Sequence, residues 1–506
     1  MMAAMQQHDG SLLSGLLEGF AVIEENDDCE ISAIQIDSRL LEQGDLFIAM
    51  QGVEKHGLEF LSEAEKMGAV AVLYDRQEAE IFSAEIDKYQ SSIQMHAVDD
   101  VRKVAGAVVS RFYAKPSARM HVVAVTGTDG KTSVTRFMAQ AMSSHMKSAV
   151  IGTTGNGFWG DIKPATHTTP DVLSLQKLLF EYEQHQAKFI AMEVSSHGID
   201  QQRIAGVEID TAVLTNVSRD HLDYHGTVEN YRAVKKQLFS LASIKNRVIN
   251  LDDATGKELA EQYVTDAGTW CYGFNEQVKA SLNYIFVVSK SANASGFDIK
   301  LQTSKGGVEL NVPLLGGFNI SNVLAVLAVE LINGVSLDAA VKNIESLTTA
   351  PGRMECFRAT GKPGVVIDYA HTPKALELAL ESLRQHFSGR VWCVFGCGGD
   401  RDQGKRPLMG QQAEKLSDIT IVTDDNPRHE KSAEIVKQIL SGFENADNAI
   451  VINDREQAIE YACNNAAAND VVLVAGKGHE DYQIVGDIKK PFSDRQLVQK
   501  LIGGAQ

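Results

Sequence analysis

The sequence predicts an α/β protein of three domains, and three observations support this fold class. The chain has 506 residues, which is too long for one ordinary hydrophobic core. From about residue 118 onward, short apolar runs alternate with helical patterns, as expected for mostly parallel sheets covered by helices. A proline-bearing segment near 117 and a turn-rich segment near 349 interrupt the pattern. The expected domains are therefore 1–117, 118–349 and 350–506.

The first domain is expected to be a small α/β domain. The runs "GDLFIAM" (44–50) and "AVAVLY" (69–74) are apolar and short enough to be buried strands. A mildly amphipathic helix is expected within the first 20 residues. Because no basic segment precedes it, this helix is not expected to be a signal peptide.

The central domain is expected to resemble P-loop ATPases, with a mostly parallel sheet. Its predicted strands are "VVAVTG" (122–127), "KFIAMEVS" (188–195), "TAVLTNVS" (211–218) and "NRVINLD" (246–252). A more β-like stretch follows at 280–315, and then an amphipathic helix, "ISNVLAVLAVELI" (320–332). The segment "LTTAPGRME" (347–355) is expected to be a linker.

Beyond the linker the alternation resumes, which predicts a second, Rossmann-like α/β domain. Its expected strands are "GVVIDYAH" (364–371), "RVWCVFGCGG" (390–399), "DITIVTDDNP" (418–427) and "DVVLVAGKGHE" (470–480). The run "ALELALESLRQHF" (375–387) has the spacing of a helix that covers such a sheet. No internal repeat or low-complexity tract interrupts it.

Composition and charge exclude several function classes. The chain is 44% hydrophobic and 23% charged, as in soluble globular proteins, and its net charge of -18 disfavours nucleic-acid and anionic-membrane binding. No apolar run approaches the ~18 residues of a membrane span. The six cysteines are scattered, which favours free thiols and a cytoplasmic location. We expect no nucleic-acid partner, no stable membrane insertion and a monomer.

The segment "HVVAVTGTDGKTSVTRFM" (121–138) predicts a strand, a glycine loop and a helix, in that order. Backbone N–H groups at a helix N-terminus favour anions, and Lys131 there can reach the β and γ phosphates of a nucleotide. Thr132 offers a hydroxyl to Mg²⁺. Val125 stands where the usual P-loop has its first glycine. A glycine turn without a ligand is the alternative, and nucleoside triphosphate binding is the interpretation that the context favours.

Two later predicted strands end in acids and histidines, "MEVSSHG" (192–198) and "TNVSRDHLDYHG" (215–226). Functional groups collect at the carboxyl ends of parallel strands, so Glu193 and His221 are candidate ligands of a Mg²⁺ ion that bridges phosphates. One alternative is zinc, with His221 and His225 as ligands but no clear third one. Another is that the histidines only hydrogen-bond a loop. In "YRAVKKQLF" (231–239), residue types alone predict that Lys235 and Lys236 are solvated helix lysines.

Ten motifs in order along nearly the whole chain resemble those of the Mur ligases, which add amino acids to the cytoplasmic peptidoglycan precursor at the expense of ATP. They are "TGTDGKT", "MEVSSHG", "TNVSRDHLDYHG", "YRAVKKQLF", "GGFNISN", "PGRMECF", "DYAHTP", "GCGGDRDQGKRPLM", "DDNPR" and "GKGHEDYQ". The pattern is most similar to the MurE subfamily, which adds the third residue to UDP-N-acetylmuramoyl-L-alanyl-D-glutamate. The resemblance implies ATP, Mg²⁺ and an acyl-phosphate intermediate on the D-glutamate carboxylate.

The resemblance also implies roles for individual residues. The implied catalytic residues are Lys131, Glu193, His221 and Lys235, with Lys235 carbamylated. The implied metal ligands are Thr132, Glu193, His221 and carbamylated Lys235. The implied nucleotide contacts are Gly127, Thr128, Asp129, Gly130, Lys131, Thr132, Ser133, Asn322, Arg353 and Asp368.

Two substrate sites follow from the same matching. The sugar nucleotide is expected at Ile36, Ser38, Val53, Glu54, Lys55, His167, Thr168, Thr169, Ser195, Gln201 and Arg203. The incoming amino acid is expected at Arg401, Asp425, Asn426, Pro427, Arg428, Gly476 and Glu480. The arginine in "DDNPR" favours meso-diaminopimelate over L-lysine, because a guanidinium binds the additional carboxylate. Three residues depart from the family pattern, Asp129, His167 and Pro170.

Other functions are weighed against this one. They are the same ligation with L-lysine, a sister ligase (folylpolyglutamate synthase or the enzyme that adds D-Ala-D-Ala), and a nucleotide-dependent switch or scaffold. The sister ligases share the loop and the three-domain plan, but "DDNPR" together with "GKGHEDYQ" argues against them. A switch would release no phosphate in response to an amino acid.

Overall fold

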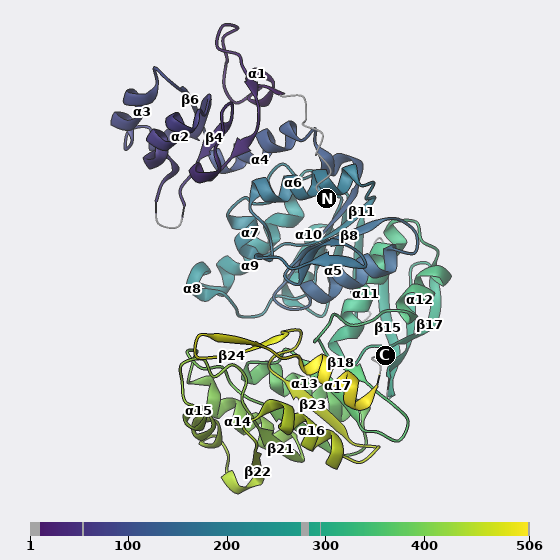
Figure 1. The fold of residues 1–506 in the computed structure, drawn as a ribbon. Helices are drawn as coiled ribbons and strands as arrows, with labels where there is room; N and C mark the ends of the chain where they lie inside the picture. The colour runs from purple at the N-terminus through teal and green to yellow at the C-terminus, as the bar shows by residue number, and fades with distance from the viewer. Residues whose placement is uncertain (1–10, 53–54, 275–282, 294, 504–506) are drawn as a thin grey trace. The chain divides into compact units, whose positions relative to one another are not determined.

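The computed structural model describes residues 11–52, 55–274, 283–293 and 295–503. These residues form two compact units (Figure 1). The first unit is built by the chain up to Cys271, and the second almost entirely by the chain from Tyr284 onward.

The first unit begins with a small α/β layer, as the sequence predicts. Its parallel sheet has the order β3 (Ile34–Gln35), β4 (Leu46–Ala49), β5 (Ala71–Asp75) and β6 (Gln94–Val98). The helix α4 (Val101–Phe112) packs into one core of this layer, and α2 (Leu61–Met67) and α3 (Ser83–Tyr89) pack into the other. The helix expected within the first 20 residues is a single turn in the described part, α1 (Leu13–Leu16), and residues 1–10 lie outside the described residues.

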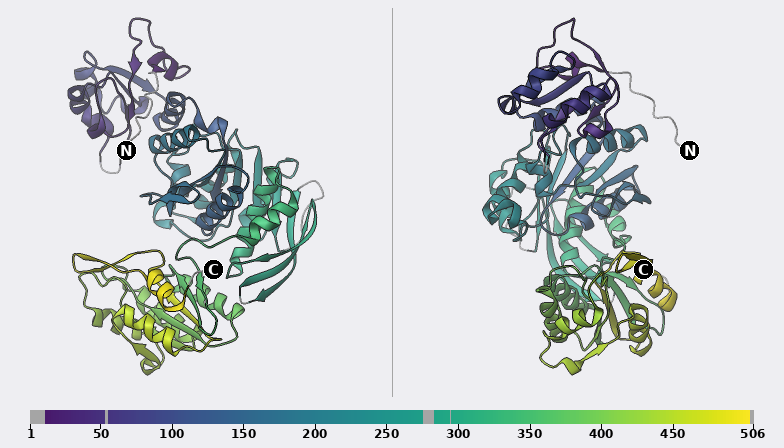
Figure 2. Two further views of the ribbon diagram at one scale, coloured as in Figure 1. Left: turned by 45° about the vertical axis from the view of Figure 1, so that its right-hand side comes forward. Right: turned by 60° about the vertical axis from the view of Figure 1, so that its left-hand side comes forward.

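The second sheet of the first unit confirms the predicted parallel arrangement. Its order is β10 (Asp161–Lys163), β9 (Gly155–Phe158), β8 (Ser148–Gly152), β11 (Phe189–Glu193), β7 (His121–Thr126), β12 (Thr211–Leu214), β13 (Asn246–Asn250) and β14 (Thr269–Gly273). The strands β8, β11, β7, β12 and β13 pair in parallel in this order. The strands β9 and β10 form an antiparallel hairpin. Figure 2 shows helices around this sheet, and Figure 1 labels among them α5 (Lys131–Met142), α6 (Val172–Gln184), α9 (Val228–Gln237) and α10 (Ala254–Gln262). The carboxyl ends of β7, β11 and β12 therefore meet at one edge.

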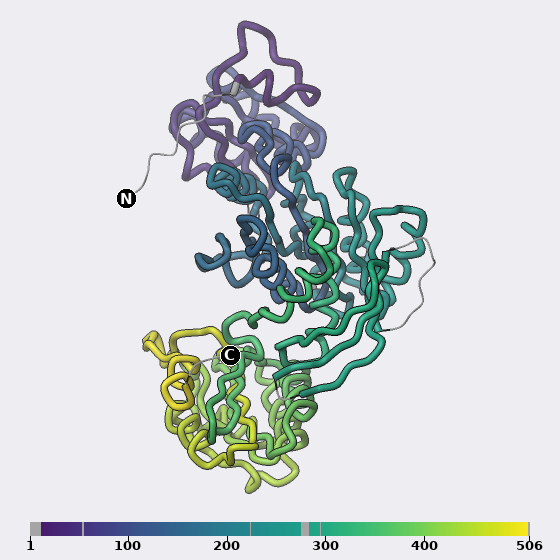
Figure 3. The backbone as a smooth tube through the Cα atoms, turned by 90° about the vertical axis from the view of Figure 1, so that its right-hand side faces the viewer, coloured from purple at the N-terminus to yellow at the C-terminus, as the bar shows by residue number. Residues whose placement is uncertain are grey.

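The second unit begins with an antiparallel meander, β15 (Asn283–Asn293), β16 (Gly296–Thr303) and β17 (Gly306–Val312), whose long strands are visible in Figure 3. Two helices follow, α11 (Phe318–Ile332) and α12 (Leu337–Glu345). The helix α11 was expected to be amphipathic, and this is wrong. Its residues 322–330 are all buried, because its apolar side chains pack on every side.

The last part of the second unit is a doubly wound sheet, as predicted. The order is β18 (Glu355–Phe357), β19 (Gly364–Asp368), β23 (Val471–Ala475), β20 (Val391–Phe395), β21 (Ile419–Val422) and β22 (Ala449–Val451), parallel except for β18. The helices α13 (Pro373–His386), α14 (Lys405–Leu416) and α15 (Ser432–Leu440) cover one face, and α16 (Arg455–Asn465) and α17 (Asp494–Ile502) cover the other. A hairpin, β24 (Tyr482–Val485) and β25 (Ile488–Pro491), follows β23.

A turn region separates α12 from β18, where the linker was expected. No helix among the described residues is long and apolar enough to cross a membrane.

Candidate active site

The glycine loop between β7 and α5 has the geometry that its sequence predicts. Gly127 and Gly130 have φ angles of 154° and 85°, which L side chains rarely adopt. A Cβ atom on Gly127 would collide with the side chain of Thr215 and lie 2.9 Å from the carbonyl oxygen of Asn216. The loop is therefore packed closely against the end of β12, and α5 begins directly at Lys131.

Lys131 folds over this loop. Its Nζ donates hydrogen bonds to the carbonyl oxygens of Gly127 and Thr128, both at 2.8 Å. Burial lowers the pKa of Lys131, and the negative charge of Glu193 acts in the opposite direction. The ammonium group thus lies beside the backbone N–H groups that open α5, in the arrangement that binds nucleotide phosphates.

Glu193, the last residue of β11, is fixed beside the start of α5 (1% exposed). Thr132 Oγ1 donates to its Oε2 at 3.0 Å, and the backbone N of Thr153 donates to its Oε1 at 2.8 Å. Burial raises the pKa of Glu193. A Cβ atom on Gly152 would collide with the carboxylate, so only glycine leaves room for it. The hydroxyl of Thr132 and this carboxylate form a set of hard oxygen donors, as Mg²⁺ prefers.

The prediction that Lys235 is a solvated lysine is wrong. Its side chain is 1% exposed, and its Nζ donates to the Gly127 carbonyl oxygen at 2.8 Å and lies 4.5 Å from the centre of the Tyr231 ring. Burial, reinforced by the positive charge of Lys131, lowers the pKa of Lys235 to about 7. Its neighbour Lys236 faces outward and pairs with Glu258 at 3.1 Å. The two lysines are neighbours in a helix, so their side chains point in different directions. Residue type alone does not distinguish them.

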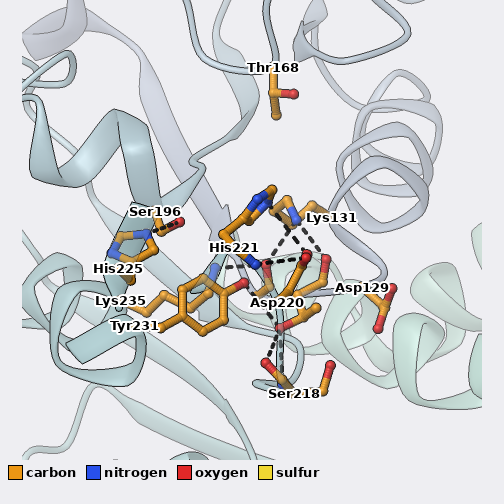
Figure 4. A network of polar contacts seen from close by, with 12 residues as sticks. Asp129, Lys131, Thr168, Ser196, Ser218, Asp220, His221, His225, Tyr231 and Lys235 are labelled. Atoms are coloured by element: carbon orange, nitrogen blue, oxygen red, sulfur yellow. Dashed lines mark hydrogen bonds and ion pairs between the residues drawn. The ribbon is translucent and has the colours of Figure 1, made fainter. Parts of the chain in front are cut away.

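The loop after β12 brings His221 and Asp220 to the same edge (Figure 4). His221 Nε2 lies 3.4 Å from Asp220 Oδ2, and the His221 backbone has a positive φ of 51°. His225 instead is buried, with Nε2 at 2.9 Å from Ser196 Oγ, as the hydrogen-bonding alternative predicts for this histidine. Among the described residues no group of three or more His, Cys, Asp or Glu is arranged so that it could hold a metal ion.

A cavity of about 350 Å³ lies in the first unit, where several predicted sugar-nucleotide residues gather. Its lining includes Ile36, His167, Gln201 and Arg203. Arg203 is held in place, because it donates to the Thr169 carbonyl oxygen at 2.8 Å and to Gln201 Oε1 at 2.7 Å. The lining also contains Arg102, Gln51 and Asp171, which the sequence reasoning missed. Arg102 lies on a helix surface and carries no motif signal. The cavity is thus a candidate anion site on an acidic protein.

The remaining residues predicted for this substrate have specific partners. Ser38 Oγ donates to Glu63 at 2.5 Å, and Lys55 lies over the Phe60 ring. Thr168 Oγ1 contacts Thr153 at 3.0 Å. Thr169 Oγ1 donates to the backbone carbonyl oxygen of Glu193, and Ser195 Oγ caps α7 (Ser196–Asp200). Val53 and Glu54 lie outside the described residues.

Three residues expected at the nucleotide belong to the second unit. Asn322 is buried near the start of α11 and donates to Asn319 Oδ1 at 2.9 Å. Arg353 lies over the Tyr369 ring, 4.8 Å from its centre. Asp368 ends β19, and the backbone N of Met354 donates to its Oδ2 at 2.8 Å. Burial raises the pKa of Asp368.

The residues predicted to hold the amino acid lie along the carboxyl ends of β20, β21 and β23. Asn426 Nδ2 donates to Glu480 Oε2 at 3.1 Å, and its Oδ1 accepts from the backbone N of Ile484 at 2.9 Å. Lys477 Nζ, which is fully buried, bridges Asn426 Oδ1 and Glu480 Oε2. Sequence reasoning missed Lys477, although it stands inside the "GKGHEDYQ" motif.

Asp425 and Arg428 complete this second-unit site. A Cβ atom on Gly476 would lie 2.7 Å from Asp425 Oδ2, so Gly476 leaves the space that the carboxylate occupies. Arg428, which follows Pro427, has a positive φ of 51° and donates from Nη1 to the Gly399 carbonyl oxygen at 2.7 Å. The loop that contains Arg401 lies close by, since a Cβ atom on Gly398 would lie 2.8 Å from Arg428 Nη1 and 3.6 Å from Arg401 Cγ. The seven predicted amino-acid contacts therefore come together at one edge of one sheet.

The first unit has a glycine loop suited to a nucleotide, and the doubly wound sheet of the second unit has a charged edge. These are the parts of an ATP-dependent enzyme. Comparison with known families supports this class. Residues 125–330 match the Mur ligase middle domain, residues 352–478 the Mur ligase glutamate ligase domain, and residues 30–113 the Mur ligase family catalytic domain. The chain belongs to the Mur ligase family.

Individual relatives agree over the full length. The UDP-N-acetylmuramoyl-L-alanyl-D-glutamate–2,6-diaminopimelate ligase of Alkalilimnicola ehrlichii is 43% identical over 97% of this chain and 98% of the relative. The ligase of the same name from Coxiella burnetii is 42% identical over 94% of this chain and 96% of its own. A solved structure of a ligase of this name has a TM-score of 0.77 at 34% identity, and covers 97% of this chain and 99% of the other.

Proposed function

We propose that this chain adds meso-diaminopimelate to UDP-N-acetylmuramoyl-L-alanyl-D-glutamate in an ATP-dependent ligation. The full-length similarity to ligases of that name supports the reaction, and the observation that carries it is the convergence of Lys131 and Lys235 on one carbonyl oxygen, that of Gly127. The three proposed domains are 1–117, 118–349 and 350–506. A cytoplasmic, monomeric enzyme without a nucleic-acid partner is part of the proposal.

ATP is proposed to bind at the glycine loop, with Mg²⁺ held by Thr132 and Glu193. The hydroxyl and the carboxylate lie 3.0 Å apart, and both are hard oxygen donors. When bound, Mg²⁺ neutralises charge on the phosphoryl group that is transferred. The ammonium group of Lys131 is proposed to stabilise the same charge. Phosphorylation of the D-glutamate carboxylate then provides phosphate as the leaving group, because a free carboxylate has none that an amine can displace.

Lys235 is proposed to carry a carbamate. Carbon dioxide reacts only with a neutral amine, and a pKa of about 7 leaves much of this amine neutral at physiological pH. The new N–C bond forms as the amine loses a proton, and the side chain changes from a cation to an anion. That change replaces the repulsion between Lys235 and Lys131 by attraction. The carbamate oxygens are proposed as ligands of a second Mg²⁺, and His221 as a ligand of the first, together with Glu193.

The UDP-sugar dipeptide is proposed to bind in the cavity with Arg203 and Gln201. The fixed guanidinium of Arg203 offers a cation for an anionic substrate on a protein of net charge -18. Arg102, which lines the same cavity and donates to the Gln51 carbonyl oxygen at 3.0 Å, is a second cation there.

Diaminopimelate is proposed to bind with its distal carboxylate at Arg428 and with the rest of the molecule held by Arg401, Asp425, Asn426, Gly476 and Glu480. The guanidinium of Arg428 binds the carboxylate that lysine lacks, and the acids bind ammonium groups. Lysine leaves Arg428 without an anion, and a site of this kind can discriminate roughly a thousandfold.

A phosphate-release assay with purified enzyme, ATP, the UDP-muramoyl dipeptide and a panel of amino acids tests the proposal. We expect release that depends on meso-diaminopimelate. Release with L-lysine alone would indicate the lysine-adding reaction, release with glutamate and a folate would indicate the sister ligase, and no amino-acid dependence would indicate a switch.

A further inference from the structure

Two arginines of the second unit, Arg406 and Arg455, are fully buried, yet neither occurs in the set of residues expected to contact a ligand. A buried guanidinium is costly unless all its hydrogen bonds are made, and replacing such an ion pair by apolar residues often costs nothing in stability. The position of each arginine relative to the second-unit site therefore needs a reason other than packing.

Arg406, on α14, joins the two loops that carry Arg401 and Arg428. Its Nη1 and Nη2 donate to both carboxylate oxygens of Glu430 at 2.8 Å, and Nη2 also donates to the Gly398 carbonyl oxygen at 3.0 Å. A fourth bond joins Nη1 to Gln438 Oε1 at 2.6 Å.

The contacts of Glu430 extend this connection to Arg428. Glu430 Oε1 accepts from the backbone N of Asp400 at 2.6 Å. Residues 398 and 400 are thereby fixed on both sides of Gly399. The carbonyl oxygen of Gly399 in turn accepts from Arg428 Nη1 at 2.7 Å. A chain of hydrogen bonds thus leads from the buried Arg406 to the guanidinium of Arg428.

Arg455, at the start of α16, holds the other end of the site. Nε and Nη2 bind both carboxylate oxygens of the buried Asp494, at 2.8 and 2.7 Å. Nη2 also donates to the Ala475 carbonyl oxygen at 2.9 Å, and Nη1 lies 3.4 Å from the Asp424 carbonyl oxygen. These two carbonyl groups immediately precede Gly476 and Asp425.

We propose that Arg406 and Arg455 are positioning residues for the amino-acid substrate, Arg406 for the end that binds the distal carboxylate and Arg455 for the end that binds ammonium. This inference rests on the proposed amino-acid site. Each arginine fixes a backbone group directly beside a proposed contact, and a displacement of about 1 Å at such a contact can cost a hundredfold in rate.

Lysine substitutions test the inference, because lysine keeps the charge but loses the planar fork that reaches two segments at once. Steady-state kinetics of Arg406→Lys should show a KM for meso-diaminopimelate raised roughly tenfold or more, with the KM values for ATP and the UDP-dipeptide unchanged. Arg406→Lys should also lower the preference for diaminopimelate over L-lysine. Arg455→Lys should raise the KM for both amino acids and leave their ratio unchanged.

Two further variants keep the test decisive if a lysine variant does not fold. Glu430→Gln weakens the same connection from a partly exposed position and should raise the KM for diaminopimelate in the same way. The control is Asp470→Asn. Asp470 is also buried and binds four donors (the backbone N of Arg390 and of Ala467, Trp392 Nε1 and Arg390 Nη2), but at the amino ends of β20 and β23. It should lower the melting temperature without a change in any KM.

Failure of the inference and failure of the proposed site give different results. If Arg428→Ala raises the KM for diaminopimelate but Arg406→Lys and Glu430→Gln do not, the positioning role is wrong and the site stands. A fall in kcat that follows the folded fraction, with unchanged KM values, also contradicts the positioning role. If Arg428→Ala has no effect, the proposed amino-acid site is wrong.

Discussion

Two parallel sheets, the one that contains β7 and the one that contains β20, differ in how the charged groups at their carboxyl edges are paired. At the edge formed by β7, β11 and β12, the half-buried Lys131 and the buried Lys235 donate to backbone carbonyl groups, and desolvation lowers the pKa of both. Glu193 there has a raised pKa. At the edge formed by β20, β21 and β23, the buried Arg406 and Arg455 each bind a carboxylate through both of its oxygens.

The difference indicates a division of labour. Groups with shifted pKa values and incomplete pairing are typical of sites where charge changes during a reaction. Guanidinium groups that bind a carboxylate through both of its oxygens keep their charge and orient the backbone around them, as recognition requires. The first edge is therefore suited to phosphoryl transfer and the second to selection of the amino acid.

The largest effect is expected for Lys131→Ala. The variant removes the cation beside the transferred phosphoryl group, so kcat should fall about a hundredfold or more. Lys147→Ala is a matched control. Lys147 lies between the end of α5 and the start of β8, is exposed, and donates a hydrogen bond to the His185 carbonyl oxygen. Steady-state phosphate release decides the matter, and near-normal turnover of Lys131→Ala would mean that the loop is structural.

Lys235→Ala should lose most activity as well, because the proposed carbamate and its negative charge disappear. Short-chain carboxylates should partly restore turnover, whereas Lys236→Ala, next to it but exposed, should behave as wild type. Intact-mass analysis of active enzyme supplied with bicarbonate should show the added mass of carbon dioxide. A free amine in fully active enzyme would refute the carbamate.

The carbamate also predicts a pH dependence. The amine must be neutral to react, and its pKa is about 7, so carbamylation should decline as the pH falls below that value. Activity at fixed total bicarbonate should fall on the same limb. An activity profile that is flat between pH 6 and 8, measured with saturating substrates, would contradict carbamylation of Lys235.

The smallest effect concerns Glu330, a fully buried residue of α11 that lies outside both edges. Burial raises the pKa of Glu330 to about 8, and Asn343 donates to its Oε1 at 2.5 Å. Because the folded state holds this proton more tightly than the unfolded state, the stabilisation is full below about pH 4.5 and is lost as the pH rises through 8.

Glu330→Gln should remove this pH dependence while it keeps the hydrogen bond to Asn343. Thermal melts of wild type and variant at pH 5 and pH 8 measure it. We expect the melting temperature of the wild type to fall more than that of the variant over this interval, and equal falls would contradict the assignment.

Much of the architecture could be predicted from the sequence, because alternating apolar strands and helices have few ways to pack. The strands β4, β5, β7, β11, β12 and β13, and the strands β19, β20, β21 and β23 of the C-terminal sheet, lie where the pattern places them. The prediction failed for α11, where helical spacing of apolar residues suggested one buried face. Periodicity within a helix cannot show how many sides other elements cover.

Candidate site residues could be proposed from the sequence where a motif combines glycine with a charged residue, as at Lys131 and Arg428, and their roles stay predictions. Burial was not predictable, and burial is what distinguishes Lys235 from Lys236, or His225 from His221. The buried Arg406 and Arg455 were missed for the same reason, since their partners Glu430 and Asp494 are distant in sequence. Lys477 was missed because its burial is not visible in the motif that contains it. Only the folded chain shows which charges are enclosed.

A competition between meso-diaminopimelate and L-lysine tests whether the edge formed by β20, β21 and β23 selects the amino acid while the edge formed by β7, β11 and β12 performs the chemistry. Purified wild-type enzyme and Arg428→Ala receive equal concentrations of both amino acids with ATP and the UDP-muramoyl dipeptide, and mass spectrometry counts the two products. We predict that the wild type incorporates diaminopimelate almost exclusively, roughly a thousandfold over lysine. Arg428→Ala should lose this preference and still release one phosphate for each product. Equal incorporation of lysine by the wild type, or an unchanged preference in Arg428→Ala, would contradict selection of the amino acid by Arg428.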